Sequence, residues 1–330
     1  MTTAAAAASA DPSTDPRRVA QVRHARPWAG AVLVALLGWA SLGVALGLSV
    51  GIADAVTRTT GAPLLLEVVL QAVLMTALAV PAAVLLRRRL DRRSLRSMGL
   101  APRVRRPVAL GAAVGAVTGA LVWIPAGALG WIRVDDLDLL AFAGFLLVNG
   151  VVLALYEAIP EEIALRGHVW TNLRDGLGLA AATILTTALF PLLGVVVAPV
   201  RALVAIVTGG EPGPLRMFPA GQDPVVYVVQ LALFGLALVA ARRIPVEGAV
   251  LVAVAFHWTQ LTVTRMVLGG PGWAPSGWDV AFVEPDAVAL VLVHIVLGGL
   301  AFVAIRVALQ VGDRRQRAAR GLRAQDPDLR

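Results

Sequence analysis

The run PEEIALRG at positions 160–167 places two adjacent carboxylates and an arginine at the end of a long apolar segment. Ionisable side chains at membrane depth are costly and by default mark functional sites. Glu162 and Arg166 are four residues apart with the acid first, which is the favourable order for an ion pair on a helix. Glu161 instead follows Glu157 by four residues, and two such carboxylates in a low dielectric cannot both be ionised cheaply. A carboxylate beside a fixed ion pair is a plausible general base for activating water.

The alternative interpretation of this run is structural. Pro160 suits the first turn of a helix, so the fourth apolar segment is expected to break there and a new helix to start. Acids in a first turn are favoured by the helix dipole, and Arg166 would then lie on lipid head groups at the cytoplasmic surface.

Of the four histidines, His257 is the strongest candidate for a site. It lies in the run FHWTQ, roughly 18 Å of helical rise beyond Pro245, and a histidine at that depth needs polar partners. The structural alternative is a hydrogen bond to a neighbouring helix, which is common in packed bundles. His168 is expected at the surface or interface, and His294 is expected to have a packing role.

Composition sets the class of protein. Of the 330 residues, 58% are hydrophobic and 15% are charged, which is typical of a polytopic membrane protein. The chain has no cysteine, which excludes disulfides, thiolate nucleophiles and cysteine–metal sites. Its basic residues cluster beside apolar segments, so membrane lipid is the expected partner and nucleic acid is not.

The chain is therefore predicted to be an all-α bundle of about eight transmembrane helices, each needing about 20 apolar residues. The expected spans are Trp28–Ala53, Pro63–Leu86, Pro107–Trp131, Leu139–Ile159, Leu177–Val200, Pro224–Ala241, Pro245–Leu268 and Ala287–Leu309.

Charge predicts the orientation of an integral cell-membrane protein. Arginines gather in the N-terminal tail, in the segment 87–106, at Arg242 and Arg243, and in the C-terminal tail. With eight spans these all fall on one side, and the positive-inside rule places both termini in the cytoplasm. The expected organisation is a disordered cytoplasmic tail over 1–26, a membrane domain over 27–312 and a basic cytoplasmic tail over 313–330.

A Glu-Glu-x-x-x-Arg-Gly run at the end of a span, in an eight-span protein, resembles the CPBP family of intramembrane proteases. That family includes type II CAAX prenyl endopeptidases and bacteriocin-processing and immunity-type proteins. The resemblance covers about residues 139–268. It implies that Glu161 activates water, that Glu162 and Arg166 support it, and that His257 binds a metal or stabilises an oxyanion. It also implies a peptide or protein substrate at the membrane and an active site open to the cytoplasm.

Two of the family's motifs are altered in this sequence. The second motif, Phe-x-x-x-His, is matched by Phe190 but has Gly194 in place of the histidine. The third motif has an Asn or Asp four residues after its histidine, where this chain has Leu261, with Gln260 one position earlier.

These departures leave the cofactor open. A catalytic zinc site requires three protein ligands, and Glu161 and His257 supply two of them. The third could come from Glu157, His168 or Gln260.

Three functions follow as hypotheses. An intramembrane endopeptidase, metallo or glutamic, requires Glu157, Glu161 and His257 to converge on one cavity. A catalytically impaired family member, acting as a membrane scaffold or immunity-type protein, requires His257 to pack on Gly194 away from Glu161. A transporter with a proton relay would show internal pseudo-symmetry, and the sequence has none.

Overall fold

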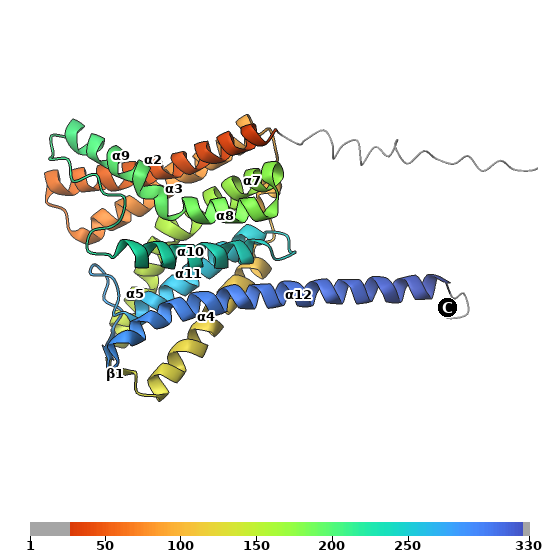
Figure 1. Ribbon diagram of the computed structural model, residues 1–330. Helices are drawn as coiled ribbons and strands as arrows, with labels where there is room; N and C mark the ends of the chain where they lie inside the picture. The colour runs from red at the N-terminus through yellow and green to blue at the C-terminus, as the bar shows by residue number, and fades with distance from the viewer. Residues whose placement is uncertain (1–26, 326–330) are drawn as a thin grey trace, which may run out of the picture.

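The computed structural model describes residues 27–325, which form a helical bundle with one small two-stranded sheet (Figure 1). Within this range seven helices are long and apolar enough to cross a membrane. A bent pair, Leu179–Leu189 and Pro191–Val207, meets at 49° and brings the possible number of spans to eight. The predicted all-α membrane bundle is confirmed. The tail over 1–26, predicted to be disordered, lies outside the described residues.

The elements follow the chain in a simple order, and glycines or prolines stand at many of their ends. The α-helices are α2 (Trp28–Thr60), α3 (Leu64–Leu85), α4 (Arg105–Ala128), α5 (Leu139–Leu153), α6 (Ile159–Glu161), α7 (Trp170–Leu177), α8 (Leu179–Leu189), α9 (Gly194–Val207), α10 (Pro224–Arg242), α11 (Ala249–Val267) and α12 (Leu290–Gln325). The 3-10 helices are η3 (Leu95–Met98), η6 (Pro191–Leu193) and η7 (Pro285–Ala289). The π-helices are η2 (Leu86–Leu90), η4 (Ala154–Ala158) and η5 (Glu162–Val169).

The fourth span does not end at Ile159, where the sequence predicted a break. The chain stays helical from Leu139 to Leu177, with the π-helices η4 and η5 on either side of α6. Pro160 has no N–H to donate and its ring crowds the preceding turn, so a helix can pass it only by distorting locally. Wider π turns provide such a distortion and are frequent at functional sites. The carboxylates therefore lie within a 39-residue helix rather than at its surface end.

The other boundaries differ less. α2 runs to Thr60, seven residues beyond the predicted end, and stops at Gly61, which adopts a left-handed conformation. α12 continues to Gln325, so the boundary predicted at residue 312 is not a helix end.

A two-stranded antiparallel sheet joins the loop before α5 to the loop before α12, and the sequence analysis did not predict it. β1 (Ile132–Leu137) pairs with β2 (Trp278–Phe282), with Ile132 opposite Phe282 and Leu137 opposite Trp278. Asp138 then caps α5 by accepting from the backbone N–H groups of Leu140 and Ala141.

Small residues let α2 and α9 approach closely. Added Cβ atoms on Gly43, Gly47 and Gly51 of α2 would lie within 2.7–2.8 Å of valines spaced in the same way on α9. Those valines are Val196, Val200 and Val204. Small residues four apart are the usual means of close helix contact in membranes. Because both series ascend together, α9 runs in the same direction as α2.

The bundle therefore has two distinct ends. At the arginine-rich end lie the start of α2, the segment 87–106 and the α10–α11 turn (Figure 1). At the opposite end, which we call the sheet end, lie β1, β2, Gly61 and the loop 208–223. Arg58 near the end of α2 donates to the hydroxyl of Thr208 at 3.1 Å, which ties that loop to the sheet end.

The sequence predicted that the basic residues of the segment 87–106 contact lipid head groups. At least one arginine of this segment is not available to lipid. Arg87 is fully buried and donates to Asp91 Oδ2 at 2.9 Å and to Ser97 Oγ. Asp91 also accepts from Asn172 Nδ2 at 3.0 Å. This network fastens the loop after α3 to the helix that carries the carboxylates.

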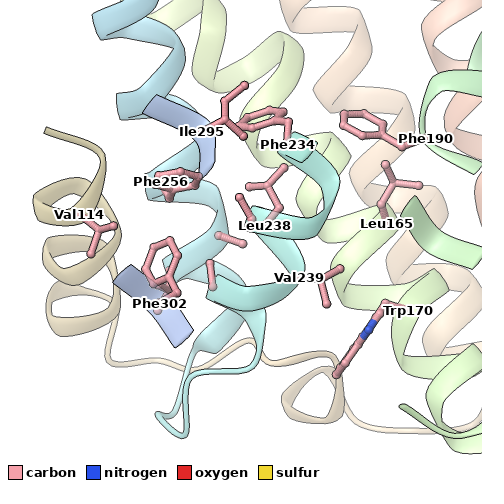
Figure 2. Packing of buried hydrophobic residues seen from close by; sticks show 14 of the residues in the cluster. Val114, Leu165, Trp170, Phe190, Phe234, Leu238, Val239, Phe256, Ile295 and Phe302 are labelled. Carbon is pink, nitrogen blue, oxygen red and sulfur yellow. The ribbon is translucent and has the colours of Figure 1, made fainter. Parts of the chain in front are cut away.

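The core beside the site is aromatic (Figure 2). The Phe256 and Phe302 rings meet edge to face at 5.1 Å between centroids, which joins α11 to α12. Phe234 on α10 contacts Phe256 and continues the cluster towards Phe190 and Leu165 (Figure 2). These contacts set the position of α11, and with it that of His257.

Candidate functional site

The predicted ion pair between Glu162 and Arg166 is present. Arg166 Nη1 donates to Glu162 Oε1 at 3.0 Å, and both side chains are fully buried. A buried charge needs a partner, and each of these charges supplies the other's. The pair therefore belongs to the interior of the protein and not to a head-group surface.

His257 also binds this pair. Its Nδ1 lies 3.0 Å from the same oxygen, Glu162 Oε1, and its ring is almost fully buried. Because a carboxylate only accepts, Nδ1 carries the hydrogen and Nε2 is the ring nitrogen left for other chemistry. The Phe234 ring holds the imidazole edge to face at 4.8 Å. The sequence analysis matched His257 with Glu161, whereas the direct contact is with Glu162.

Aromatic and backbone groups hold Arg166 in place. Its guanidinium lies 4.5 Å from the centroid of Phe190, a cation–π contact that gives the phenylalanine of the altered second motif a structural role. Arg242 Nε donates to the backbone carbonyl of Arg166 at 3.2 Å, so α10 and η5 are joined at this point. Arg166 and Phe190 thus fix the carboxylate that orients His257.

A cavity of about 930 Å³ lies beside this group. Glu157, Glu161 and His257 all line it, as the protease hypothesis requires. Glu161 is half-buried, and its carboxylate has no hydrogen-bond or ion-pair partner among the described residues. Further polar groups reach the cavity from η4, α10 and α11, namely Tyr156, Tyr227, Gln230, Gln260, Thr264 and Arg265.

Glu157 is held by a partner that the sequence analysis missed. Arg265 Nη2 donates to Glu157 Oε1, while Arg265 Nη1 donates to Asn149 Oδ1 at 3.1 Å. The sequence predicted that Glu157 and Glu161 repel each other. The positive charge of Arg265 reduces that repulsion because it neutralises Glu157. Arg265 was detectable in the sequence, since it is ionisable and lies in the same apolar segment as His257.

A buried amide lies one turn beyond His257 on α11. Gln260 is fully buried and its Nε2 donates to Thr264 Oγ1 at 3.0 Å. Its Oε1 has no partner in the part of the chain that the structure describes. Both Gln260 and Leu261 line the cavity.

The position of Gly194 has no room for a histidine side chain. A Cβ added to Gly194 would lie 1.8 Å from the carbonyl oxygen of Met217, in the loop 208–223. This loop also lines the cavity, so its packing against Gly194 closes one side of the site.

Gly194→Ala is therefore expected to displace the loop. Overpacking of this kind costs about 1–3 kcal/mol, so the unfolding midpoint should fall by a few degrees and trypsin should cut faster after Arg216. Thermal unfolding and limited proteolysis of the detergent-solubilised protein measure both. The control is Gly127→Ala, since a Cβ there meets no atom within 4 Å. A Gly194→Ala protein with unchanged melting and cleavage would show that the loop does not pack closely there.

The cavity reaches the sheet end, whereas the resemblance implied a site open to the cytoplasm. Its lining includes Asp54 near the end of α2, Arg201 on α9 and much of the loop 208–223. It includes no residue of 87–106 or of the α10–α11 turn. The positive-inside rule assigned the arginine-rich end to the cytoplasm, and the motif was predicted at the end of its span. The helix in fact continues past the motif, which leaves the carboxylates inside the bundle.

The residues present do not fit a metal centre. No group of three or more His, Asp or Glu that could hold a metal ion is found within residues 27–325. The proposed ligands Glu161 and His257 both line the cavity, but the carboxylate and the remaining imidazole nitrogen, Nε2, make two of the three ligands that a catalytic zinc requires. His168, predicted at the surface, is fully buried against Gly38 of α2 and is not a cavity residue. His294 lies 2.9 Å from the Gly115 carbonyl oxygen, which agrees with its expected packing role.

No protein-family model, curated protein or solved structure matches this chain.

Proposed function

We propose that the protein is a CPBP-type intramembrane endopeptidase in which Glu161 activates water to hydrolyse a peptide bond of a membrane-associated substrate. One observation carries the proposal. An unpaired carboxylate, Glu161, lines the same cavity as His257, whose other ring nitrogen is fixed by the buried pair Glu162–Arg166. An oriented imidazole and a separate carboxylate in one cavity supply the general acid and general base that amide hydrolysis needs.

In the proposed reaction Glu161 removes a proton from water while the water oxygen attacks the scissile carbonyl carbon. The new C–O bond gives a tetrahedral oxyanion. His257 in its protonated form stabilises that oxyanion from Nε2 and gives its proton to the departing amide nitrogen as the C–N bond breaks. The proton held by Glu161 then restores the imidazolium. Glu162 holds Nδ1–H throughout, as the carboxylate of a catalytic triad does.

Water fits this cavity better than a covalent nucleophile. The lining contains no serine, and the chain has no cysteine. Its aliphatic hydroxyl belongs to Thr264, which accepts a hydrogen bond from Gln260. The absence of an activated hydroxyl beside the imidazole supports direct hydrolysis rather than an acyl-enzyme.

The arginines suggest how the protein is oriented. We place the arginine-rich end in the cytoplasm by the positive-inside rule, with both termini on that side of the cell membrane. The cavity mouth at the sheet end then faces the non-cytoplasmic side.

Glu161→Gln tests the proposal. The change removes the base and keeps the shape, so hydrolysis should fall by at least about 10²-fold. Mass spectrometry of labelled N-termini in membranes from producing cells would compare wild type, Glu161→Gln and Glu247→Gln, the last being an exposed glutamate outside the cavity. New termini should appear with wild type and Glu247→Gln and be absent with Glu161→Gln. If the three samples showed the same set of N-termini, the proposal that the protein is a hydrolase would be wrong.

A second candidate is a catalytically impaired family member that acts as a membrane scaffold or immunity-type protein. The observation in its favour is Gly194, where the family has a histidine and where the Met217 carbonyl leaves no room for one. Under this proposal the Glu162–Arg166–His257 group serves only to hold α10, α11 and η5 together. Unchanged termini, together with a Glu161→Gln protein that retains its biological effect, would favour it.

A further inference from the structure

Two arginines that line the cavity form no direct ion pair in the described part of the chain. Arg201 on α9 and Arg216 in the loop 208–223 both line the cavity. The side chain of neither has a hydrogen-bond or ion-pair partner within residues 27–325. The third cavity arginine, Arg265, is neutralised by Glu157.

The acids at that end do not balance them. Asp54 lies 3.6 Å from Arg58 and is paired on its own helix. Glu211 is the acidic residue that the loop contributes to the lining, so the outer half of the cavity has two arginines against one glutamate, while the unpaired Glu161 lies deeper in the same cavity. An arginine in a membrane-spanning helix that faces a cavity typically marks the path of a ligand.

The position of Arg201 argues against a purely lipid-facing role. Long arginine side chains near helix ends often reach out to the membrane surface. Arg201, however, lines the same cavity as Glu161, with Ala198 and Val197 lining it one turn deeper on α9. The loop that carries Arg216 packs across this mouth through Met217 and Gly194. Both cations therefore lie between the sheet end and the catalytic group.

We propose that the outer half of the cavity is a subsite for the carboxylate of an acidic peptide, bound by Arg201 and Arg216 and entered from the sheet end. Guanidinium groups bind carboxylates through paired hydrogen bonds, which favours this ligand chemistry. The amides of Gln222 and Gln230 and the hydroxyl of Tyr227 line the cavity too and suit a peptide backbone. That the ligand is a peptide rests on the proposed hydrolase function. The subsite then predicts that the substrate has an acidic sequence and reaches the protein from the non-cytoplasmic side.

The lack of cysteine in the chain permits a direct test by charge-selective labelling. Ala198→Cys places one thiol in the cavity, and rates are measured with an anionic and a cationic membrane-impermeant methanethiosulfonate of similar size. Val134→Cys measures reagent access to the sheet end outside the cavity. Val246→Cys measures reagent access to the arginine-rich end. Both valines are exposed. All variants carry Glu161→Gln, so that no result depends on hydrolysis.

In intact cells, Ala198→Cys and Val134→Cys should react and Val246→Cys should not. Arg201→Gln with Arg216→Gln should lower the anionic-to-cationic rate ratio at Ala198→Cys by about tenfold, because a charged cleft concentrates counter-ions. The ratio at Val134→Cys should not change, and Arg201→Lys with Arg216→Lys should retain the wild-type ratio. An unchanged ratio at Ala198→Cys, or reaction there only after permeabilisation, would overturn the subsite or its side of access.

A protection experiment identifies the source of the anion. The probe is acetyl-Leu-Val-Glu-Leu-Val-amide, compared with its Gln analogue and with dihexanoylphosphatidylglycerol. The Glu peptide should slow cationic labelling of Ala198→Cys at least about fivefold more than the Gln peptide, and the difference should vanish in the double Arg→Gln protein. Protection by the lipid alone, or equal protection by both peptides, would contradict a peptide carboxylate site.

Discussion

Arg166→Met should lower the free energy of unfolding by about 3–5 kcal/mol, because it leaves the fully buried Glu162 carboxylate without its cation. The remaining partner, His257, contacts the same oxygen and leaves the other carboxylate oxygen without a partner among the described residues. Loss of the guanidinium also removes the contact with Phe190. The unfolding midpoint in detergent, followed by circular dichroism, measures the effect.

The double variant Glu162→Leu with Arg166→Met separates charge from packing. Replacing both members of a buried ion pair by apolar groups is often neutral or stabilising, so most of the lost stability should return. Activity should not return, because His257 would then lack the carboxylate that orients it. If Arg166→Met alone melted like the wild type, the pair would not be a buried structural element.

His257→Asn should reduce hydrolysis by about 10²–10⁴-fold and leave the unfolding midpoint close to that of the wild type. The Asn side-chain amide sits near the position of Nδ1, so the hydrogen bond to Glu162 Oε1 can persist. The titratable Nε2 is lost, and with it the proposed proton donor. Turnover of a substrate identified from the N-terminal comparison, measured alongside thermal unfolding, provides both values.

His294→Gln is the matched control for that variant. His294 is equally buried, but its Nε2 contacts the Gly115 carbonyl outside the cavity, and a Gln amide can donate to the same oxygen. Turnover should stay within a few-fold of the wild type. Equal loss in His257→Asn and His294→Gln would point to general perturbation of the bundle, and full activity of His257→Asn would remove the imidazole from the mechanism.

Much of the architecture was predictable because it depends on local composition. Long apolar runs specify membrane helices, and seven such helices are found within residues 27–325, or eight if the bent pair α8–α9 crosses as one span. The pairing of Glu162 with Arg166 was likewise predictable, since residues four apart meet on a single helix whatever its neighbours do. His257 was identifiable because a histidine inside an apolar segment needs a polar partner.

The choice of partners across helices depended on the tertiary structure. Whether His257 contacts Glu161 or Glu162 depends on the rotation of the helix about its axis, and the π turns around Pro160 change that rotation. The same applies to Glu157 and Arg265, which are 108 residues apart. Local spacing contains no information on either choice.

The end of the bundle at which the cavity opens could also not be predicted without the folded structure. Residues within single apolar segments were enough to predict the membrane bundle, the pairing of Glu162 with Arg166 and the candidate histidine. The folded chain was needed to find that the loop 208–223 folds back over Gly194 and that the cavity reaches the sheet end. The physical reason is that contacts within a helix follow from residue spacing, whereas a cavity is formed by the crossing and packing of helices that are distant in the chain.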